Sequence, residues 1–272
     1  MAFLIDEEVR DRVEQLEIDF NRYGYDAYGV SKKQLVRSYS LLALLYRKYF
    51  DVSIYGIEKV PARGRAMLIG NHSGGLALDA TIVMTSMLLE AQPPRLVQAM
   101  VDRFLGRVPF ASRFTSRMGH LIGLPEHAVE LLEAERLLLV FPEGHHGTAK
   151  LYGDRNSLVK FGPGFMRLAL QTKSPIVPFA FIGGGEAIPT IANLERTGKL
   201  LGLPYLPLTP YVLPLPRPVS LELYYSEPML FEGTGNEEDK VIQGYVEQVK
   251  ERVAELIERG VQMRKHRGEA SF

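Results

Sequence analysis

Residues 66–90 read AMLIGNHSGGLALDATIVMTSMLLE, a short apolar run followed by a glycine-rich turn and a longer apolar segment. The first run is typical of a strand, and the segment after the turn is typical of a helix. Similar alternation of β-prone runs and helical segments extends from about residue 51 to residue 227. The sequence therefore predicts an α/β fold, with a mostly parallel central sheet flanked by helices.

The expected elements extend this pattern in both directions. Strands are expected at residues 52–57, 66–70, 95–100, 137–141, 176–181 and 219–225, and helices at residues 80–90, 109–117, 126–134 and 163–172. The charged, periodic segment 237–266 predicts a long solvent-facing helix. We divide the chain into an N-terminal helical region, residues 1–50, and one main domain, residues 51–272, that includes the C-terminal helix.

Composition excludes several kinds of site. The 272 residues are 46% hydrophobic and 24% charged, as in a folded globular protein. Lys plus Arg and Asp plus Glu number 32 each, so the formal net charge is zero and nucleic acid is not an expected partner. Because the chain contains no cysteine, disulfides, thiolate metal sites and cysteine nucleophiles are excluded.

Residues 31–50, SKKQLVRSYSLLALLYRKYF, contain five basic residues and no acidic one. At helical spacing one face holds Leu35, Tyr39, Leu42, Tyr46 and Tyr49, and the other holds Arg37, Leu44, Arg47 and Lys48. An amphipathic basic helix of this kind suits a membrane interface, but it equally suits packing on the protein core. Both interpretations stay open, and the first of them makes residues 1–50 a membrane-docking region.

A membrane-spanning helix is not predicted. The longest uncharged stretch, residues 200–216, contains five prolines, which are incompatible with a helix. It either folds over the core or inserts at a membrane surface, where Tyr205 and Tyr211 would suit the interface. The first thirty residues lack the features of a secretory signal. We therefore expect a peripheral protein on the cytoplasmic side of a membrane.

The turn after residues 66–70 contains the first candidate for chemistry. His72 lies just beyond the end of a predicted strand, where ligands bind in open α/β sheets. A histidine with a nearby acid, here Asp79, is the minimum needed to deprotonate a hydroxyl group. The alternative is that Asp79 caps a helix and that His72 is an ordinary polar residue.

The second candidate follows the apolar strand at residues 137–141, where the sequence continues as FPEGHHG from Phe141. Glu143 could accept hydrogen bonds from a substrate hydroxyl or from the backbone of a neighbouring loop. His145 and His146 lack a third ligand at a recognisable spacing, so a metal site is not expected.

Together, His72 with Asp79 and the FPEG turn resemble the motifs of the glycerolipid acyltransferase family, which includes 1-acylglycerol-3-phosphate acyltransferases. That family has a later proline-rich strand, here PIVP at residues 175–178, and its branch related to monoacylglycerol and diacylglycerol acyltransferases is similar at residues 162–165. Between its two main motifs the family has a basic stretch, here Arg95, Arg103, Arg107, Arg113 and Arg117. The resemblance covers residues 52–225.

The resemblance implies an enzyme of glycerolipid and phospholipid metabolism that transfers a fatty acyl group to a lipid hydroxyl. The implied donor is acyl-CoA or acyl carrier protein, the implied acceptor is a glycerolipid or lysophospholipid, and no other cofactor is implied. By matching position, His72 is the general base and Asp79 its orienting partner. The implied substrate-binding residues are Glu143, Gly144, Phe141, Pro142, His146, Arg103 and Arg107.

Two departures from the family pattern affect these roles. Six residues, rather than four, separate His72 from Asp79, so the turn must bulge for the side chains to meet. The Arg that commonly follows Glu-Gly in phosphate-handling members is replaced by a histidine pair, which favours a less charged acceptor. A lysophosphatidate-specific acyltransferase, with charge supplied by Lys150 and the basic stretch, is one alternative. A non-catalytic lipid-binding module is another.

Overall fold

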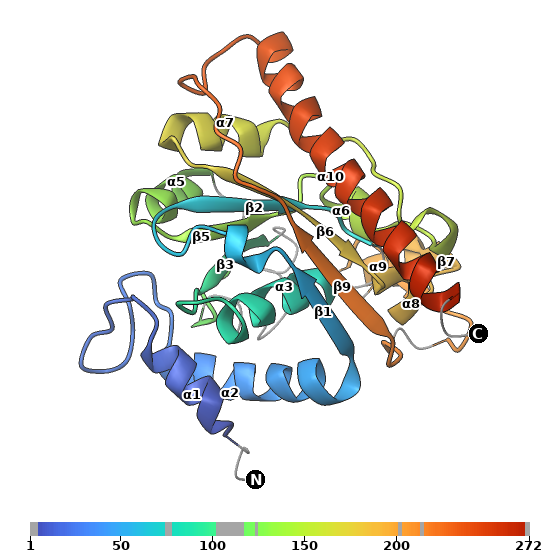
Figure 1. Ribbon diagram of the computed structural model, residues 1–272, viewed down its shortest axis with the longest axis horizontal. Coiled ribbons are helices and arrows are strands. Elements are labelled where there is room, and N and C mark those ends of the chain that lie inside the picture. The colour runs from blue at the N-terminus through green and yellow to red at the C-terminus, as the bar shows by residue number, and fades with distance from the viewer. Residues whose placement is uncertain are drawn as a thin grey trace.

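The computed structural model describes residues 5–73, 78–101, 117–122, 125–200, 203–212 and 215–269. Seven strands form its central sheet, in the spatial order β1-β9-β6-β2-β5-β3-β4. Their bounds are β1 (Asp51–Tyr55), β2 (Ala66–Gly70), β3 (Val97–Val101), β4 (Leu121–Ile122), β5 (Leu137–Val140), β6 (Ile176–Ile182) and β9 (Ser220–Tyr225). Helices cover both faces, so the molecule has three layers (Figure 1).

Five neighbouring strands, from β6 to β4, are parallel. β9 pairs with β6 in the antiparallel sense and with β1 in parallel, so β1 and β9 run opposite to the other five. The reversal follows from the connection, because β6 ends and β9 begins at the same edge, where Ile182 faces Glu222. The predicted mostly parallel sheet is confirmed, and the six expected strands lie within two residues of their predicted bounds.

Two hydrophobic cores lie on the two faces of the sheet. In β2, Leu68 belongs to the core under α3 (Leu78–Leu89), whereas Met67 and Ile69 belong to the core under α5 (Pro125–Glu133), α7 (Gly164–Thr172) and α10 (Asp239–Glu269). Successive side chains of a strand point to opposite faces. A strand buried on both faces needs a continuous apolar run, which residues 66–69 provide.

The N-terminal helices share the first of these cores. α1 (Glu7–Glu14) and α2 (Lys32–Leu44) pack on α3, and η1 (Leu45–Tyr49) continues α2 towards β1. Leu35, Tyr39 and Tyr46, from the apolar face identified in the sequence, are buried in this core. That face therefore packs on the protein, and the opposite face of α2 leaves Leu41 and Leu44 exposed.

The long C-terminal helix forms as expected, but only its outer face meets solvent. Its inner face packs along β6 and β9 and buries Ile242, Val246, Val249, Val253 and Ile257. Their spacing of three or four residues places them on one side of the helix.

Several short elements are not predicted by the sequence, because they are too short to show a period. They are η2 (Ile57–Lys59), α6 (His145–Thr148), η4 (Tyr152–Asp154), α8 (Gly184–Ala187), β7 (Ala192–Leu194), α9 (Glu195–Leu200) and β8 (Leu206–Leu208). The helix expected at residues 109–117 lies outside the described residues, apart from Arg117. In the described part of the chain, no helix is long and apolar enough to cross a membrane.

Candidate active site

β2 places His72 at the carboxyl edge of the sheet. The imidazole Nδ1 lies 2.7 Å from a carboxylate oxygen of Asp79, in the first turn of α3. The two side chains are 9% and 1% exposed, so the contact is shielded from water. A carboxylate only accepts hydrogen bonds, so Nδ1 donates and Nε2 is left as the acceptor of the ring. The longer turn therefore does allow these side chains to meet.

Asp79 also serves the helix that contains it. Its second carboxylate oxygen accepts a hydrogen bond from the Ala80 N–H at 2.7 Å. First-turn N–H groups have no partner within a helix, and the helix dipole favours a negative charge at this end. One carboxylate thus contacts both the imidazole of His72 and an N–H group in the first turn of α3.

The ring of Phe141 packs against the face of the imidazole. The two rings are stacked with centroids 3.9 Å apart and an interplanar angle of 14°. Phe141 in turn packs edge-on against Phe179 of β6. Because β2 and β5 are neighbouring parallel strands, with Ile69 opposite Val140, the two motifs leave the sheet side by side.

The carboxylate of Glu143 points into the protein and is 0% exposed. It accepts hydrogen bonds from the N–H groups of His72 and Val159, both at 3.1 Å. Its two oxygens also lie 2.8 and 2.7 Å from Nζ of Lys150, which donates to the His72 carbonyl as well, at 2.7 Å. Burial lowers the pKa of the Lys150 ammonium, and the Glu143 charge opposes that shift. These contacts agree with the interpretation in which Glu143 accepts hydrogen bonds from the backbone of a neighbouring loop.

Two glycines permit this arrangement. Gly144 has a φ of 56°, in the left-handed region that disfavours side chains. At Gly147, a Cβ atom would lie 2.5 Å from a carboxylate oxygen of Glu143 and 2.9 Å from the Cβ of His72. Glycine at position 147 therefore lets the turn approach His72 closely.

The other predicted substrate-binding residues are distributed more widely. Pro142 is half-buried, and its carbonyl accepts a hydrogen bond from the segment before α7. His146 is exposed on α6, with its ring 4.0 Å from that of His145. Among the described residues, no group of three potential ligands could hold a metal ion. Arg103 and Arg107 lie outside the described residues.

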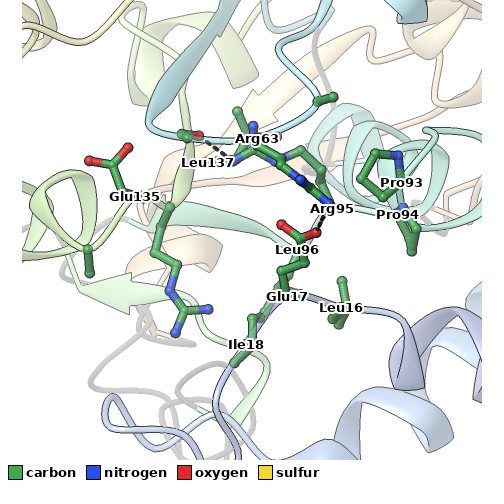
Figure 2. Close-up of a pocket in the computed structure, with 14 residues that line it drawn as sticks. Leu16, Glu17, Ile18, Arg63, Pro93, Pro94, Arg95, Leu96, Glu135 and Leu137 are labelled. Atoms are coloured by element: carbon green, nitrogen blue, oxygen red, sulfur yellow. Dashed lines mark hydrogen bonds and ion pairs between the residues drawn. The ribbon is translucent and has the colours of Figure 1, made fainter.

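Arg95, the first member of the basic stretch, lies at the opposite edge of the sheet from His72. It lines a cavity of about 140 Å³ together with Arg63 and Glu17 (Figure 2). Its buried guanidinium donates to two carbonyl groups of the loop at residues 61–64. Burial lowers the pKa of Arg95 to about 10. Arg95 therefore braces the loop before β2 and takes no part in the His72 site.

Two further residues contribute to the site without any motif that reveals them. Asn71 exchanges two side-chain hydrogen bonds with the backbone of Phe181, at 2.9 and 3.0 Å, which ties the start of the His72 turn to β6. Tyr205, from the proline-rich segment, donates its hydroxyl to Thr148 of α6 at 2.5 Å. Burial raises the pKa of the Tyr205 phenol, and the Asp79 charge adds to the rise. This part of the proline-rich segment therefore folds onto the protein beside the site.

A buried carboxylate that is hydrogen-bonded to an imidazole at the carboxyl edge of an α/β sheet is an arrangement that can transfer protons. Residues 51–182 match the model of the Acyltransferase family. The matched segment contains His72, Asp79 and the FPEG turn. The resemblance that the sequence motifs indicate is thus confirmed.

The fold is similar to the crystal structure of the 1-acyl-sn-glycerophosphate (LPA) acyltransferase PlsC from Thermotoga maritima, with a TM-score of 0.53 and 19% identity over 83% of this chain and 82% of that chain. At this identity the similarity describes the fold alone.

Among curated proteins, an uncharacterized protein of Mycobacterium tuberculosis is 33% identical over 202 residues, which are 74% of this chain and 55% of the relative. The DGAT1/2-independent enzyme synthesizing storage lipids of Homo sapiens is 25% identical over 158 residues, which are 57% of this chain and 46% of the relative. The chain spans about half the length of the curated relatives it matches.

Proposed function

We propose that this protein transfers a fatty acyl group from an acyl thioester, acyl-CoA or acyl carrier protein, to a hydroxyl group of a glycerolipid or lysophospholipid. The main support is the 2.7 Å contact between Nδ1 of His72 and Asp79, within the segment that matches the Acyltransferase family model. That contact fixes the nitrogen that holds the proton and leaves Nε2 to act as a base. A positioned base contributes typically about 10²- to 10⁴-fold to the rate.

In the proposed reaction, Nε2 of His72 removes the proton of the acceptor hydroxyl while the hydroxyl oxygen attacks the thioester carbon. The tetrahedral intermediate then collapses, the carbon–sulfur bond breaks, and the leaving thiolate takes the proton from the imidazolium. Between the two steps the Asp79 carboxylate stabilises the imidazolium. The chain contains no cysteine, so direct transfer is favoured over a thiol-bound intermediate.

We propose an acceptor without a phosphate group as the preferred substrate. Lys150, the basic residue beside His72, is 2% exposed and has its charge paired within the protein. The name of the human relative, an enzyme that synthesizes storage lipids, agrees with an uncharged acceptor. A lysophosphatidate-specific enzyme is the second candidate, because Arg103 and Arg107 of the basic stretch could supply positive charge.

We further propose that an apolar cavity beside the FPEG turn takes the acyl chain. Its volume of about 420 Å³ lies within the range of ligand pockets. The cavity is lined mainly by Met100, Val140, Pro142, Phe165 and Leu168. The cavity lies on the sheet face that α5, α7 and α10 cover, and Pro142 links it along the chain to Phe141, whose ring stacks on His72.

The proposed activity is tested by measuring thiol release from palmitoyl-CoA, with ester formation followed by mass spectrometry. The acceptors are a monoacylglycerol, lysophosphatidylcholine and lysophosphatidate, and the panel is repeated with palmitoyl acyl carrier protein. We expect thiol and ester in equal amounts, formed fastest with the monoacylglycerol. A clear preference for lysophosphatidate would favour the second candidate. Lipid binding without ester in any combination would identify a non-catalytic module.

We also propose that the outer face of α2 and η1 docks on a membrane surface. Leu41 and Leu44 are 52% and 56% exposed, and the basic residues Arg37 and Lys48 are exposed beside them. The hydroxyl of Tyr49 donates to the Pro216 carbonyl at 2.6 Å, so the end of the proline-rich segment lies next to this face. Exposed leucines with basic neighbours suit an anionic lipid surface. The presence of this face supports the proposal that the protein binds peripherally to a membrane.

Replacing the two leucines by glutamine, Leu41→Gln with Leu44→Gln, is expected to weaken binding to vesicles of phosphatidylcholine and phosphatidylglycerol at least about tenfold. Each buried leucine contributes about 1.5–3 kcal/mol, and neither leucine is part of the core. Co-sedimentation measures the binding constant. Leu230→Gln, at a residue 77% exposed near the start of β6, is the control and is expected to bind like the wild type. If the double variant bound vesicles as tightly as the wild type, this face would be excluded as the membrane-binding surface.

A further inference from the structure

The two peptide groups that flank the Cα of His72 are held by one buried ion pair. The His72 N–H donates to Glu143 at 3.1 Å, and the His72 carbonyl accepts from Lys150 at 2.7 Å. Glu143 and Lys150 are themselves joined at 2.7 Å, with side chains 0% and 2% exposed. The pair therefore forms a closed bracket around the backbone of His72.

The position of this bracket along the chain explains why His72 needs it. β2 ends at Gly70, and α3 begins at Leu78, so His72 has no helix or strand of its own to fix it. Asn71 anchors the preceding residue to β6 through the two hydrogen bonds to Phe181. Beyond that anchor, the bracket fixes the peptide groups from which the imidazole projects.

A buried ion pair is weak evidence for a role in stability, because the desolvation of two charges offsets much of their attraction. Apolar residues of similar volume often stabilise a protein equally well. Apolar residues could not, however, accept a hydrogen bond from the N–H of His72 and donate one to its carbonyl group. The ion pair supplies both functions at once, which apolar packing cannot replace.

We propose that Lys150 is a positioning residue of the acyl-transfer reaction, which acts with Glu143 to fix the backbone of His72 so that Nε2 faces the acceptor hydroxyl. This inference rests on the proposed function. It assigns the lysine charge to the base rather than to an acceptor phosphate, and it assigns Glu143 to the same bracket. A misplacement of about 1 Å can reduce a rate about 10²-fold, so loss of the bracket is expected to lower kcat.

The absence of cysteine allows a test by chemical replacement of the ammonium group. A Lys150→Cys variant is alkylated in denaturant with 2-bromoethylamine, which restores an ammonium group at nearly the original position, or with 1-iodopropane, which gives an apolar side chain of the same shape. Both forms are refolded beside wild-type protein treated identically. Because the propyl form leaves Glu143 without its counterion, a second variant, Lys150→Met with Glu143→Gln, removes both charges together.

We expect the propyl form and the double variant to show kcat reduced about 10²-fold per folded molecule, with the acceptor KM nearly unchanged. The aminoethyl form is expected to recover most of the wild-type kcat. The control is Arg136→Met, which breaks the buried ion pair with Asp26, 3.1 Å long and located before β5 at the opposite edge of the sheet. That variant is expected to lose stability and keep its kcat.

A nuclear magnetic resonance measurement separates this inference from the proposed function. The proton on Nδ1 of His72, bound to Asp79, should give a ring N–H resonance that is missing from the His72→Ala spectrum. We expect the resonance to be the same in the wild type and the aminoethyl form, and displaced or lost in the propyl form, even if no thioester is consumed. Unchanged kcat and an unchanged resonance in the propyl form would overturn the inference. A higher acceptor KM at unchanged kcat would overturn it too, because it would assign Lys150 to substrate binding.

Discussion

Replacement of Asp79 by Asn is expected to lower kcat about 10⁴-fold while the protein stays folded. An amide can donate a hydrogen bond to Nδ1 of His72, and this favours the tautomer with its proton on Nε2, which cannot accept a proton from a hydroxyl. The amide oxygen can still accept from the Ala80 N–H, so this hydrogen bond in the first turn of α3 is preserved. Steady-state thiol release measures kcat, and thermal unfolding followed by circular dichroism measures the fold.

The matched control is Asp26→Asn, at another fully buried carboxylate. Asp26 pairs with Arg136 and accepts from the Val30 N–H at 2.8 Å, away from His72. This variant is expected to lose stability without a fall in kcat per folded molecule. If Asp79→Asn kept its kcat, or if both variants lost the same amount, Asp79 would not be the orienting acid.

The sequence pattern was sufficient to predict the positions of the main strands. It did not predict features that depend on contacts between residues distant in the sequence. The run at residues 66–69 predicts β2 because a strand buried on both faces must be apolar throughout. The two-residue strand β4 is too short to show any period. The reversed direction of β9 depends on the path between β6 and β9, which local composition does not encode.

The same limit applies to helix surfaces. Periodicity correctly identified two different faces of α2, but it could not decide which face meets the core. The face with Leu35 and Tyr39 does so, because α1 and α3 pack against it. The exposed Leu41 and Leu44 on the other face are visible only once that packing is known.

In the candidate site, motif order predicted two segments that would lie together, and the structure places them side by side. Parallel pairing of β2 with β5 brings His72 against Phe141, as two strand-end motifs suggest. The bracket by Lys150 could not be predicted, because a lysine in a loop has no pattern that distinguishes a buried ammonium from a solvated one. Its role depends on contacts to peptide groups, which side-chain identity does not reveal.

Replacement of His72 by Ala is expected to lower kcat about 10²- to 10⁴-fold, since the variant lacks the base. The fold should persist, because Glu143 and Lys150 bind the peptide groups of residue 72 and not its ring. The stacking on Phe141 and the hydrogen bond to Asp79 are lost, so a modest fall in the unfolding temperature is expected. Circular dichroism at both ends of the unfolding curve checks that the comparison is between folded proteins.

The most direct test is one assay that counts ester formed and thiol released, with palmitoyl-CoA and a monoacylglycerol, for the wild type and for His72→Ala at equal concentrations of folded protein. We predict equal amounts of ester and thiol from the wild type, and at least about a hundredfold slower formation of both from the variant. Ester formation at the wild-type rate by His72→Ala would contradict the assignment of the imidazole as the base.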